Sequence, residues 1–415
     1  MDAQNPRAAV SKGANVLLLR QPICDPEYLR TRGHEVAIVD TTIAMGSGGN
    51  LAQGPPVTTL IDTLVDIGLD TIAGNNPVFI TVHADKNLED CISVIPGDNV
   101  VLQIDASAEP TEKVIETMVK LRSDGYRFAL KNFRYRPSLD PILPLAHYVK
   151  LNIRSIGLEG VREERERLSK YDLRYLAVGA DSSDDVKLVM KCGFDLIQGY
   201  FFCKPNSYRH KSPAGNRLTV VRLLAKLRDP AIGPKELETI IAEDVSLSYR
   251  LLRFINSAMN GLSRRVDSVR HAATLVGTER LRSWAMVVAF SKFDDTPREL
   301  LMVSLLRAKL AERVAEELGL PNRDAYFTAG LFSTIDAFLD CQMVDALESL
   351  PLSEEVSLAL LSHSGRMGQI LESIKQYEQG NWSALVNCLH SPDAVQRAYL
   401  HSLDWVRQSV REMGS

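Results

Sequence analysis

The first half of the chain alternates between short apolar runs and amphipathic segments, and this alternation constrains the fold more than any other feature. Eight runs between Val16 and Phe202 are rich in Val, Ile, Leu and aromatic residues, as strands buried on both faces are. They are NVLLLR (15–20), EVAIVD (35–40), PVFITVHA (77–84), NVVLQIDA (99–106), RFALKNF (127–133), YVKLNI (148–153), LRYLAVGA (173–180) and DLIQGYFF (195–202). Eight strands that alternate with helices predict an α/β domain of the (β/α)8-barrel type, with a doubly wound sheet as the alternative.

Two of the intervening segments carry clear helix signals. In TEKVIETMVKLRSDG (111–125), Val114, Met118 and Leu121 share one helical face, and a glycine closes the segment. DSSDDVKLVMKCG (181–193) begins with serines suited to an N-cap and also ends in glycine. Both segments therefore predict helices between strands.

The pattern changes after residue 206, where strand-like runs vanish and amphipathic helices follow one another. SLSYRLLRFINSAM (246–259) places Leu247, Leu251, Phe254 and Ile255 on one stripe. The polar stretch CKPNSYRHKSPAGN (203–216) predicts a linker. The predicted organisation is a flexible N-terminal tail at 1–13, a barrel at 14–206 and an all-α domain at 207–415.

Composition excludes several classes of function. The chain has 415 residues and a net charge of −4 with acids and bases interspersed, so no dedicated nucleic-acid site is expected. Its six cysteines are scattered without a C-x-x-C pair, which predicts reduced thiols in a cytoplasmic protein. No apolar run reaches the length of about 18 residues that a membrane span needs, and the first residues lack the apolar core of a secretory signal.

Five motifs fall in the order and spacing of an EAL domain. They are RQPICD (20–25), GHEVAIVD (33–40), FALKNF (128–133), YVKLNI (148–153) and IQGYFFCKP (197–205). The first half therefore resembles an EAL domain over nearly all of residues 14–206. The resemblance implies a barrel descended from enzymes that hydrolyse cyclic di-GMP with two divalent metal ions.

Most of the metal-binding acids of the EAL family are missing at the matching positions of this chain. The E-x-L glutamate is retained as Glu35, and the glutamine of QGY is retained as Gln198. The other positions that the resemblance implies are Thr81 for the third-strand Asn, Gln103 for the fourth-strand Glu, Lys131 and Asn132 for the Asp pair, Asn152 for the Asp of K-x-D, Val178 for the later Glu and Val39 for the Arg after E-x-L.

The missing acids predict a domain without catalysis and without a bound metal. Two Mg²⁺ or Mn²⁺ ions need carboxylates to offset their dehydration, whereas the amides carry no charge and Lys131 would repel a cation. Glu35 is then expected to persist as a hydrogen-bonded core residue. A displaced ligand set of Glu35 and Asp105 stays open, because Asp105 and Gln103 share one strand face.

The pocket has two further predicted properties. Lys131 and nearby amides could meet a phosphate, so metal-independent binding of cyclic di-GMP stays open, although it is not expected. Because unpaired buried polar groups cost about 1–3 kcal/mol each, the pocket residues are expected to satisfy one another. The predicted partners are Lys131 with Glu35 or Asp105, and Asn132 and Asn152 with Gln103 or Gln198.

The second half resembles an HDOD domain, the metal-free relative of the HD phosphohydrolase fold. The resemblance rests on INSA (255–258) after an amphipathic helix and on SVRHAATLVG (268–277), and it spans most of residues 213–385. The chain contains no His-Asp dipeptide. Where an HD enzyme would read G-L-x-H-D, this chain reads GLFSTID (330–336), so the resemblance implies that Ser333 and Thr334 replace the metal ligands.

Together, the two resemblances imply an inactive bacterial EAL–HDOD signalling protein without a cofactor. It is expected to regulate motility or biofilm formation through protein–protein contacts, and by family analogy to form a homodimer. The alternatives are a metal-independent cyclic di-GMP sensor and an active phosphodiesterase with a shifted site. The basic groups Arg264 with Arg265 and Arg280 with Arg282 are either a partner surface or, more simply, a solvated helix face.

Overall fold

The structure is a computed structural model that divides into two compact units, Met1–Phe201 and Phe202–Ser415, each described by itself below. The residues described are 16–40, 57–82, 92, 95, 97–203, 214–229, 232–257, 260, 262, 266–293, 296–348, 350, 352–381 and 392–414. The predicted tail at 1–13 and the predicted boundary at 206 lie outside them, as does most of the predicted linker at 203–216.

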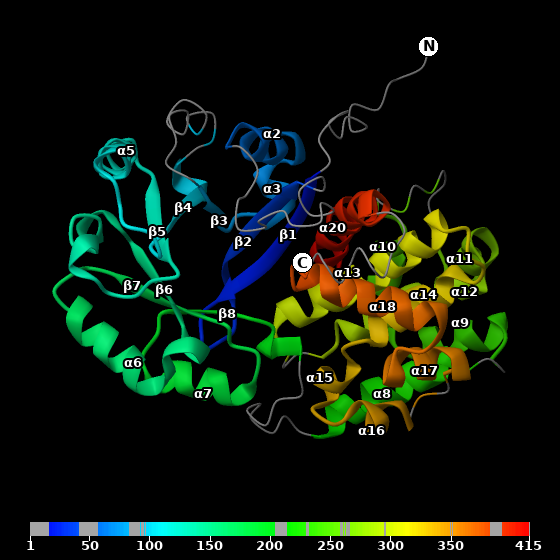
Figure 1. The fold of residues 1–415 in the computed structure, drawn as a ribbon. Helices are drawn as coiled ribbons and strands as arrows, with labels where there is room; N and C mark the ends of the chain where they lie inside the picture. Colours follow the sequence, from blue (N-terminus) through cyan, green and yellow to red (C-terminus); the bar gives the residue numbers. More distant parts are fainter. Residues whose placement is uncertain are drawn as a thin grey trace, which may run out of the picture. The chain divides into compact units, whose positions relative to one another are not determined.

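The first unit is a closed barrel in the strand order β1 to β8 (Figure 1). Its strands are β1 (Val16–Cys24), β2 (Thr31–Asp40), β3 (Val78–Thr81), β4 (Val100–Asp105), β5 (Arg127–Lys131), β6 (Tyr148–Asn152), β7 (Arg174–Val178) and β8 (Leu196–Gln198). Each of the eight predicted runs overlaps one of these strands, although β1 continues past its run to Cys24 and β2 begins before its run, at Thr31. The ring closes where β8 pairs with β1. The predicted barrel is therefore confirmed, and the doubly wound sheet is excluded.

One strand departs from the (β/α)8 pattern, because β1 runs antiparallel to both of its neighbours. The cause is the short connection between Cys24 and Thr31, in which Asp25 N donates to Arg30 O at 3.0 Å and Leu29 N donates to Asp25 O at 3.1 Å. A parallel pair needs a crossover of about a dozen residues or more, so this tight turn forces a hairpin. The hairpin register sets Gln21 opposite Glu35.

The helices of the barrel follow β2, β4, β6 and β7. They are α2 (Val57–Ile67), α3 (Leu69–Ala73), α5 (Glu112–Ser123), α6 (Ile153–Leu168) and α7 (Ser183–Lys191). Both predicted helices are confirmed: Thr111 caps α5, which buries Met118 and Leu121, and Ser182 forms a capping box with Asp185 at the start of α7. Between β5 and β6 the described chain has only short 3₁₀ turns, η2 (Pro137–Leu139) and η3 (Leu143–Leu145).

The second unit is helical throughout the part described, as predicted (Figure 1). Its helices are α8 (Ala214–Arg228), α9 (Pro234–Ala242), α10 (Val245–Ile255), α11 (Val269–Val276), α12 (Thr278–Phe290), α13 (Arg298–Glu317), α14 (Arg323–Phe332), α15 (Ile335–Leu339), α16 (Met343–Glu348), α17 (Glu354–Ser362), α18 (Gly365–Glu378) and α20 (Pro392–Gly414). The predicted stripe on α10 is fully buried.

Helix α13 lies at the centre of this unit and packs closely on α14. A Cβ atom at Gly330 of α14 would lie 2.4 Å from the Arg307 carbonyl oxygen and 2.5 Å from Ala308 Cα, so only glycine allows this approach. Around it, Phe254 packs edge-on against Trp284 and Trp405, with ring centroids 5.9 and 6.0 Å apart. The polar side chains on the inner side of α13 are consequently buried in a rigid, close-packed core.

The described cysteines, Cys24, Cys192, Cys203 and Cys341, are free thiols. Cys91 and Cys388 lie outside the described residues. None of the helices in the described ranges is both long enough and apolar enough to cross a bilayer.

Candidate functional site

The barrel interior has an apolar layer and, one strand repeat further on, a polar layer. The apolar layer is the cluster Ile23, Phe79, Val101, Ala129, Tyr148, Leu176 and Leu196. Because strand side chains alternate, the residue two positions later points the same way, so β4 places Gln103 above Val101 and β6 places Lys150 above Tyr148. The polar layer lies at the carboxyl ends of the parallel strands, where (β/α)8 enzymes build their active sites.

Glu35 is the centre of the polar layer, and its carboxylate is surrounded by donors. Gln103 Nε2 donates to Glu35 Oε1 at 2.8 Å, and Lys150 Nζ lies 3.0 Å from Oε2. Gln198 Nε2 also donates to Oε2 and to Gln21 Oε1, the latter at 2.7 Å. Lys150 Nζ donates to Gln103 Oε1 at 2.7 Å as well, which closes a ring of contacts across the barrel.

The network fixes the charge of Glu35. Burial alone would raise the pKa of this carboxyl, but the charge of Lys150 and the hydrogen bonds from Gln198, Gln103 and Lys150 outweigh it and lower the pKa to about 2. Burial lowers the pKa of Lys150, and the adjacent Glu35 carboxylate opposes that shift. The Lys150 side chain is only 4% exposed and the Glu35 side chain is 22% exposed, so this is a partly buried ion pair that holds β2 against β6.

The other predicted residues form a second cluster at the strand ends. Lys131 Nζ donates to Thr81 Oγ1 at 3.2 Å, and Asn132 Nδ2 donates to Asp105 Oδ2 at 3.0 Å. Asp105 also accepts from Ser107 N at 2.9 Å. Burial would raise the pKa of Asp105, but hydrogen bonds from Ser107 and Asn132 and the charge of Lys131 lower it.

Asn152 has a structural task, since its Oδ1 atom accepts from Arg154 N at 3.2 Å and from Ser155 N at 3.3 Å. It is thus the N-cap of α6. Val178, the position of the later Glu, packs against the apolar layer.

Several predicted pairings are wrong, and the predicted mutual satisfaction of the pocket residues is incomplete, because the buried Oε1 atom of Gln198 has no hydrogen-bond partner within the described residues. Glu35 is paired with Lys150 and not with Lys131, because Lys131 is the last residue of β5 and its ammonium is hydrogen-bonded to Thr81. Asn132 bonds Asp105 and not Gln103 or Gln198; it follows the last residue of β5 and has a left-handed φ of 53°, so it no longer continues the strand. Asn152 bonds backbone N–H groups and neither glutamine.

Sequence reasoning missed Lys150 and Gln21. A lysine inside the apolar run YVKLNI, two positions before Asn152, was a signal for Lys150, because the two side chains share one strand face. Gln21 became visible only with the hairpin register, which sets it opposite Glu35.

The donor set of the polar layer does not fit a pair of divalent metal ions. Every oxygen of Glu35 already accepts a hydrogen bond, and one partner is an ammonium that repels a cation. Asp105 is engaged by Ser107 and Asn132 at the strand ends. Within the described ranges, no three His, Cys, Asp or Glu residues are grouped as metal ligands would be.

In the helical unit, Ser333 and Thr334 are buried beside an internal ion pair. Arg307 of α13 donates from Nε to both carboxylate oxygens of Glu378, at 2.9 and 3.0 Å, and from Nη2 to Oε2 at 2.6 Å. Arg307 Nη1 also lies 3.4 Å from Ser333 Oγ, and the Thr334 hydroxyl is bonded to Ser304 at 2.5 Å. A guanidinium therefore lies next to Ser333 and Thr334, the positions where the metal ligands of an HD enzyme would stand.

The arginines of the two predicted basic groups differ in their burial and contacts. Arg282 is 3% exposed and donates to the carbonyl oxygens of Leu227, Asp229 and Ile232, so reading it as part of a surface is wrong. Its guanidinium closes the loop after α8, which explains its burial. Arg280 is exposed and lies over the Trp284 ring. Arg264 and Arg265 lie outside the described residues.

Comparison with known families identifies the helical unit. The HDOD domain family matches residues 217–357, which contain α9 to α16 and the Ser333–Thr334 position. The helical unit contains an HDOD domain. Its predicted landmarks are in place: Asn256 ends α10 and bonds Val266, and Ser268 caps α11, which ends at Gly277.

Two curated proteins are similar over most of the chain. The cyclic di-GMP phosphodiesterase CdgJ of Vibrio cholerae is 28% identical over 370 residues, covering 88% of this chain and 85% of that protein. The uncharacterized protein YuxH of Bacillus subtilis is 29% identical over 368 residues, covering 85% of this chain and 90% of its own.

Among solved structures, this chain is similar to EAL enzymes over part of its length. The EAL enzyme Bd1971, solved with cAMP and cyclic di-GMP bound, is 16% identical with a TM-score of 0.36. The similarity covers 46% of this chain and 62% of that one, so this chain matches less than two thirds of the length of that enzyme. The chain has a closed eight-stranded barrel followed by a helical unit that contains an HDOD domain, in the order expected from its sequence.

Proposed function

We propose that this chain is a catalytically inactive regulator in cyclic di-GMP signalling that acts through contacts with other proteins. The observation that carries the proposal is the state of Glu35. This carboxylate, the one acid retained from the pattern of the EAL family's first strands, is bonded on both oxygens to Lys150, Gln103 and Gln198.

The assignment to cyclic di-GMP signalling is supported by the relatives. The Vibrio cholerae protein is named as a phosphodiesterase of this nucleotide, and the similarity to it spans both units of the chain. An HDOD domain in the second unit is consistent with a signalling protein that combines two modules. In both modules a positive side chain, Lys150 or Arg307, is paired with an internal carboxylate.

The inactivity follows from the chemistry that phosphodiester hydrolysis requires. Two metal ions would have to bind the attacking and the leaving oxygen, and each ion needs several anionic oxygen ligands. Here the network supplies one carboxylate, three carboxamides and one ammonium, and both oxygens of the carboxylate are already hydrogen-bonded within it. To bind a metal ion, Glu35 would have to leave Lys150. Removing one partner of a buried ion pair typically costs about 3–5 kcal/mol of stability.

An active phosphodiesterase is the second candidate, because the Vibrio cholerae relative is named as one. Activity would require Glu35 to leave Lys150 and to join Asp105 around a metal ion. Asp105 already accepts from Ser107 and Asn132, so both acids would have to exchange their present partners.

Calorimetry with cyclic di-GMP separates the proposal from its rivals. The full chain is titrated once with Mg²⁺ and once with EDTA. No binding heat in either condition is expected. Metal-independent heat would instead identify a sensor, and metal-dependent heat followed by turnover would identify an enzyme. Either result would refute the proposal.

The contact-based part of the proposal is tested in the native host. A chromosomal Glu35→Gln replacement is compared with a deletion and with the parent for motility and biofilm formation, with protein levels matched by immunoblot. We expect the replacement to behave like the parent, because a regulator of this kind does not need the carboxylate for chemistry. Replacement that reproduces the deletion at equal protein level would refute inactivity.

A further inference from the structure

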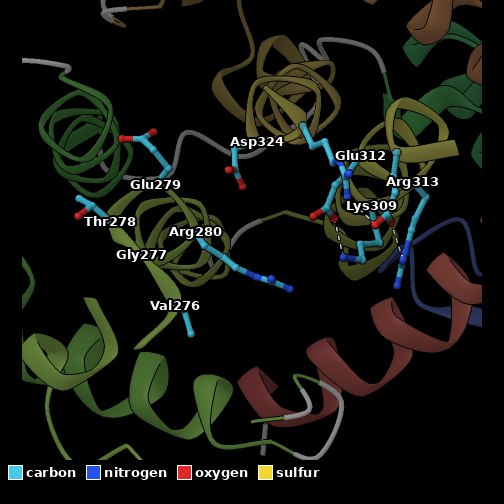
Figure 2. Close-up of a pocket in the computed structure, with 11 residues that line it drawn as sticks. Val276, Gly277, Thr278, Glu279, Arg280, Lys309, Glu312, Arg313 and Asp324 are labelled. Carbon is cyan, nitrogen blue, oxygen red and sulfur yellow. Dashed lines mark hydrogen bonds and ion pairs between the residues drawn. The ribbon is translucent and has the colours of Figure 1, made fainter. Parts of the chain in front are cut away.

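The HDOD-containing unit has a charged cavity that is separate from the Arg307–Glu378 pair. It has a volume of about 520 Å³ and lies where the start of α12 faces α13 and the start of α14 (Figure 2). Its lining residues are Val276, Gly277, Thr278, Glu279, Arg280, Lys309, Glu312, Arg313, Glu316, Arg323 and Asp324. This volume is in the range of about 300–1,000 Å³ that is typical of small-molecule sites.

Most charges of the cavity wall are paired with each other. Lys309 is bonded to Glu312 at 2.5 Å, Arg313 to Glu316 at 2.7 Å and Arg323 to Glu316 at 2.6 Å. These pairs fix the wall that α13 contributes, and they leave little charge on it for a ligand.

Arg280 and Asp324 differ from the rest of the lining. Figure 2 shows both side chains extending into the cavity, from α12 and from the first turn of α14. In the described part of the chain, neither side chain has a salt bridge or a hydrogen bond to another group. The Arg280 guanidinium is 5.3 Å from the centre of the Trp284 ring, which orients it without using its N–H donors.

The electrostatic surroundings indicate the missing partners. Burial and the nearby Glu312 raise the pKa of Asp324, while Arg280 opposes them from a distance. A positive group beside Asp324 would relieve this repulsion. Gly277 is an N-cap without a side-chain hydrogen bond, so the first turn of α12 next to Arg280 favours a negative group.

The net charge of the cavity lining indicates what charge a ligand should carry. Arg280, Lys309, Arg313 and Arg323 balance Glu279, Glu312, Glu316 and Asp324, so the formal sum is zero. A purely anionic ligand would meet Asp324 and Glu312, and a purely cationic one would meet Arg280 and Arg313. A ligand with both charges and no net charge avoids both penalties.

We propose that this cavity binds a small zwitterion, a free amino acid or a dipeptide, with its carboxylate on Arg280 and its ammonium on Asp324. The two protein groups come from different helices, so the ligand would join α12 to α14. The site is independent of the barrel, and the proposal is independent of whether the barrel is active.

Ligand-observed saturation-transfer NMR on the full chain tests the proposal. The probes are the common free amino acids and dialanine, each at about 10 mM so that weak binding is detected. We expect at least one probe to receive saturation. Its N-acetyl and carboxamide derivatives, which lack the ammonium or the carboxylate, should then bind about tenfold more weakly or not at all. No transfer to any probe would overturn the proposal, as would equal binding of the capped derivatives.

Variants locate the site. Arg280→Gln and Asp324→Asn should each weaken the binding probe by about tenfold, the loss expected for one charge-assisted contact. The matched controls are Arg270→Gln and Asp345→Asn, two exposed positions outside the cavity, and they should bind as the parent does. Tryptophan fluorescence checks that each variant is folded. Binding that survives both cavity variants would overturn the assignment.

Discussion

Lys150 on β6 extends across the barrel interior to Glu35 on β2, with 3.0 Å between Nζ and Oε2, and the same ammonium donates to Gln103 on β4 at 2.7 Å. Three strands far apart in sequence are thereby joined by two hydrogen bonds of one side chain. The polar layer at the barrel mouth has become an internal network, and its loss should appear first as instability.

Removing the lysine should destabilise the barrel strongly. Lys150→Met leaves the partly buried Glu35 carboxylate with its two glutamine donors but without its counter-charge, which should lower the free energy of unfolding by about 3 kcal/mol. Lys131→Met is the matched control, since it loses one hydrogen bond to Thr81 and should cost about 1 kcal/mol. Hydrogen exchange of peptides covering β2 and β6 in the full chain measures both. Equal effects of the two variants would contradict the assigned pairing.

The stability of the barrel should fall in acid because of Glu35. The pKa of Glu35 is about 2 in the folded chain and 4.5 in its ordinary state, so the ionised form stabilises the fold above pH 4.5. This contribution, about 3 kcal/mol at most, should be lost as the pH falls towards 2. The difference in urea stability between the parent and Glu35→Gln should therefore shrink from pH 6 to pH 3.

The infrared strand band suits this measurement, because the described strands all lie in the barrel. Glu116→Gln, an exposed change on α5, is the control and should show a constant difference from the parent across this pH range. A gap between parent and Glu35→Gln that does not depend on pH would show that the carboxylate is not held ionised by its neighbours.

The barrel was predictable because its signals are local. Each buried strand is a run of apolar residues, and Thr111 and Ser182 are N-cap residues that mark the starts of α5 and α7. The antiparallel direction of β1 was not predicted, although the short segment between Cys24 and Thr31 leaves no room for a crossover. The direction of β1 could have been predicted from the number of residues between the strands, but not from the composition of the strands.

The sequence predicted which residues belong to the polar layer, but not which of them form hydrogen bonds with each other. Strand alternation and the EAL resemblance place Glu35, Gln103 and Gln198 in one layer, and the structure brings them together. The partners depend on how far each side chain extends along the barrel axis. Lys150 lies one strand repeat deeper than Asn152 and therefore reaches Glu35, whereas Lys131 is at a strand end. Sequence spacing alone does not give that depth.

Separating the ion pair of the helical unit should be costly, but replacing both partners should not. Arg307→Met leaves the Glu378 carboxylate, 7% exposed, without its bidentate partner and should cost about 3–5 kcal/mol. The double variant Arg307→Met with Glu378→Met should recover most of this loss. Arg313→Met breaks a half-exposed pair and should cost about 1 kcal/mol or less.

Urea unfolding followed by tryptophan fluorescence reports on this unit, because all three tryptophans lie beyond residue 202. A double variant as unstable as the single one would show that the pair contributes more than mutual charge compensation.

Restoring acids should make the barrel depend on metal. Gln103→Glu with Asn152→Asp places a second carboxylate beside Glu35, where Gln103 Nε2 now donates at 2.8 Å, and removes the amide from the α6 cap. Like charges should lower the melting temperature in EDTA, and Mg²⁺ should restore part of it. Asn99→Asp, exposed at the start of β4, is the control. No melting change in EDTA would contradict the charge argument.

The most direct test of the central claim is an assay of the purified full chain with cyclic di-GMP and either Mg²⁺ or Mn²⁺, with products separated by chromatography. We expect no linear or mononucleotide product above the control without protein, because Glu35 is held by Lys150, Gln103 and Gln198 and is not available to bind two metal ions. Metal-dependent turnover that disappears in Glu35→Gln would contradict it.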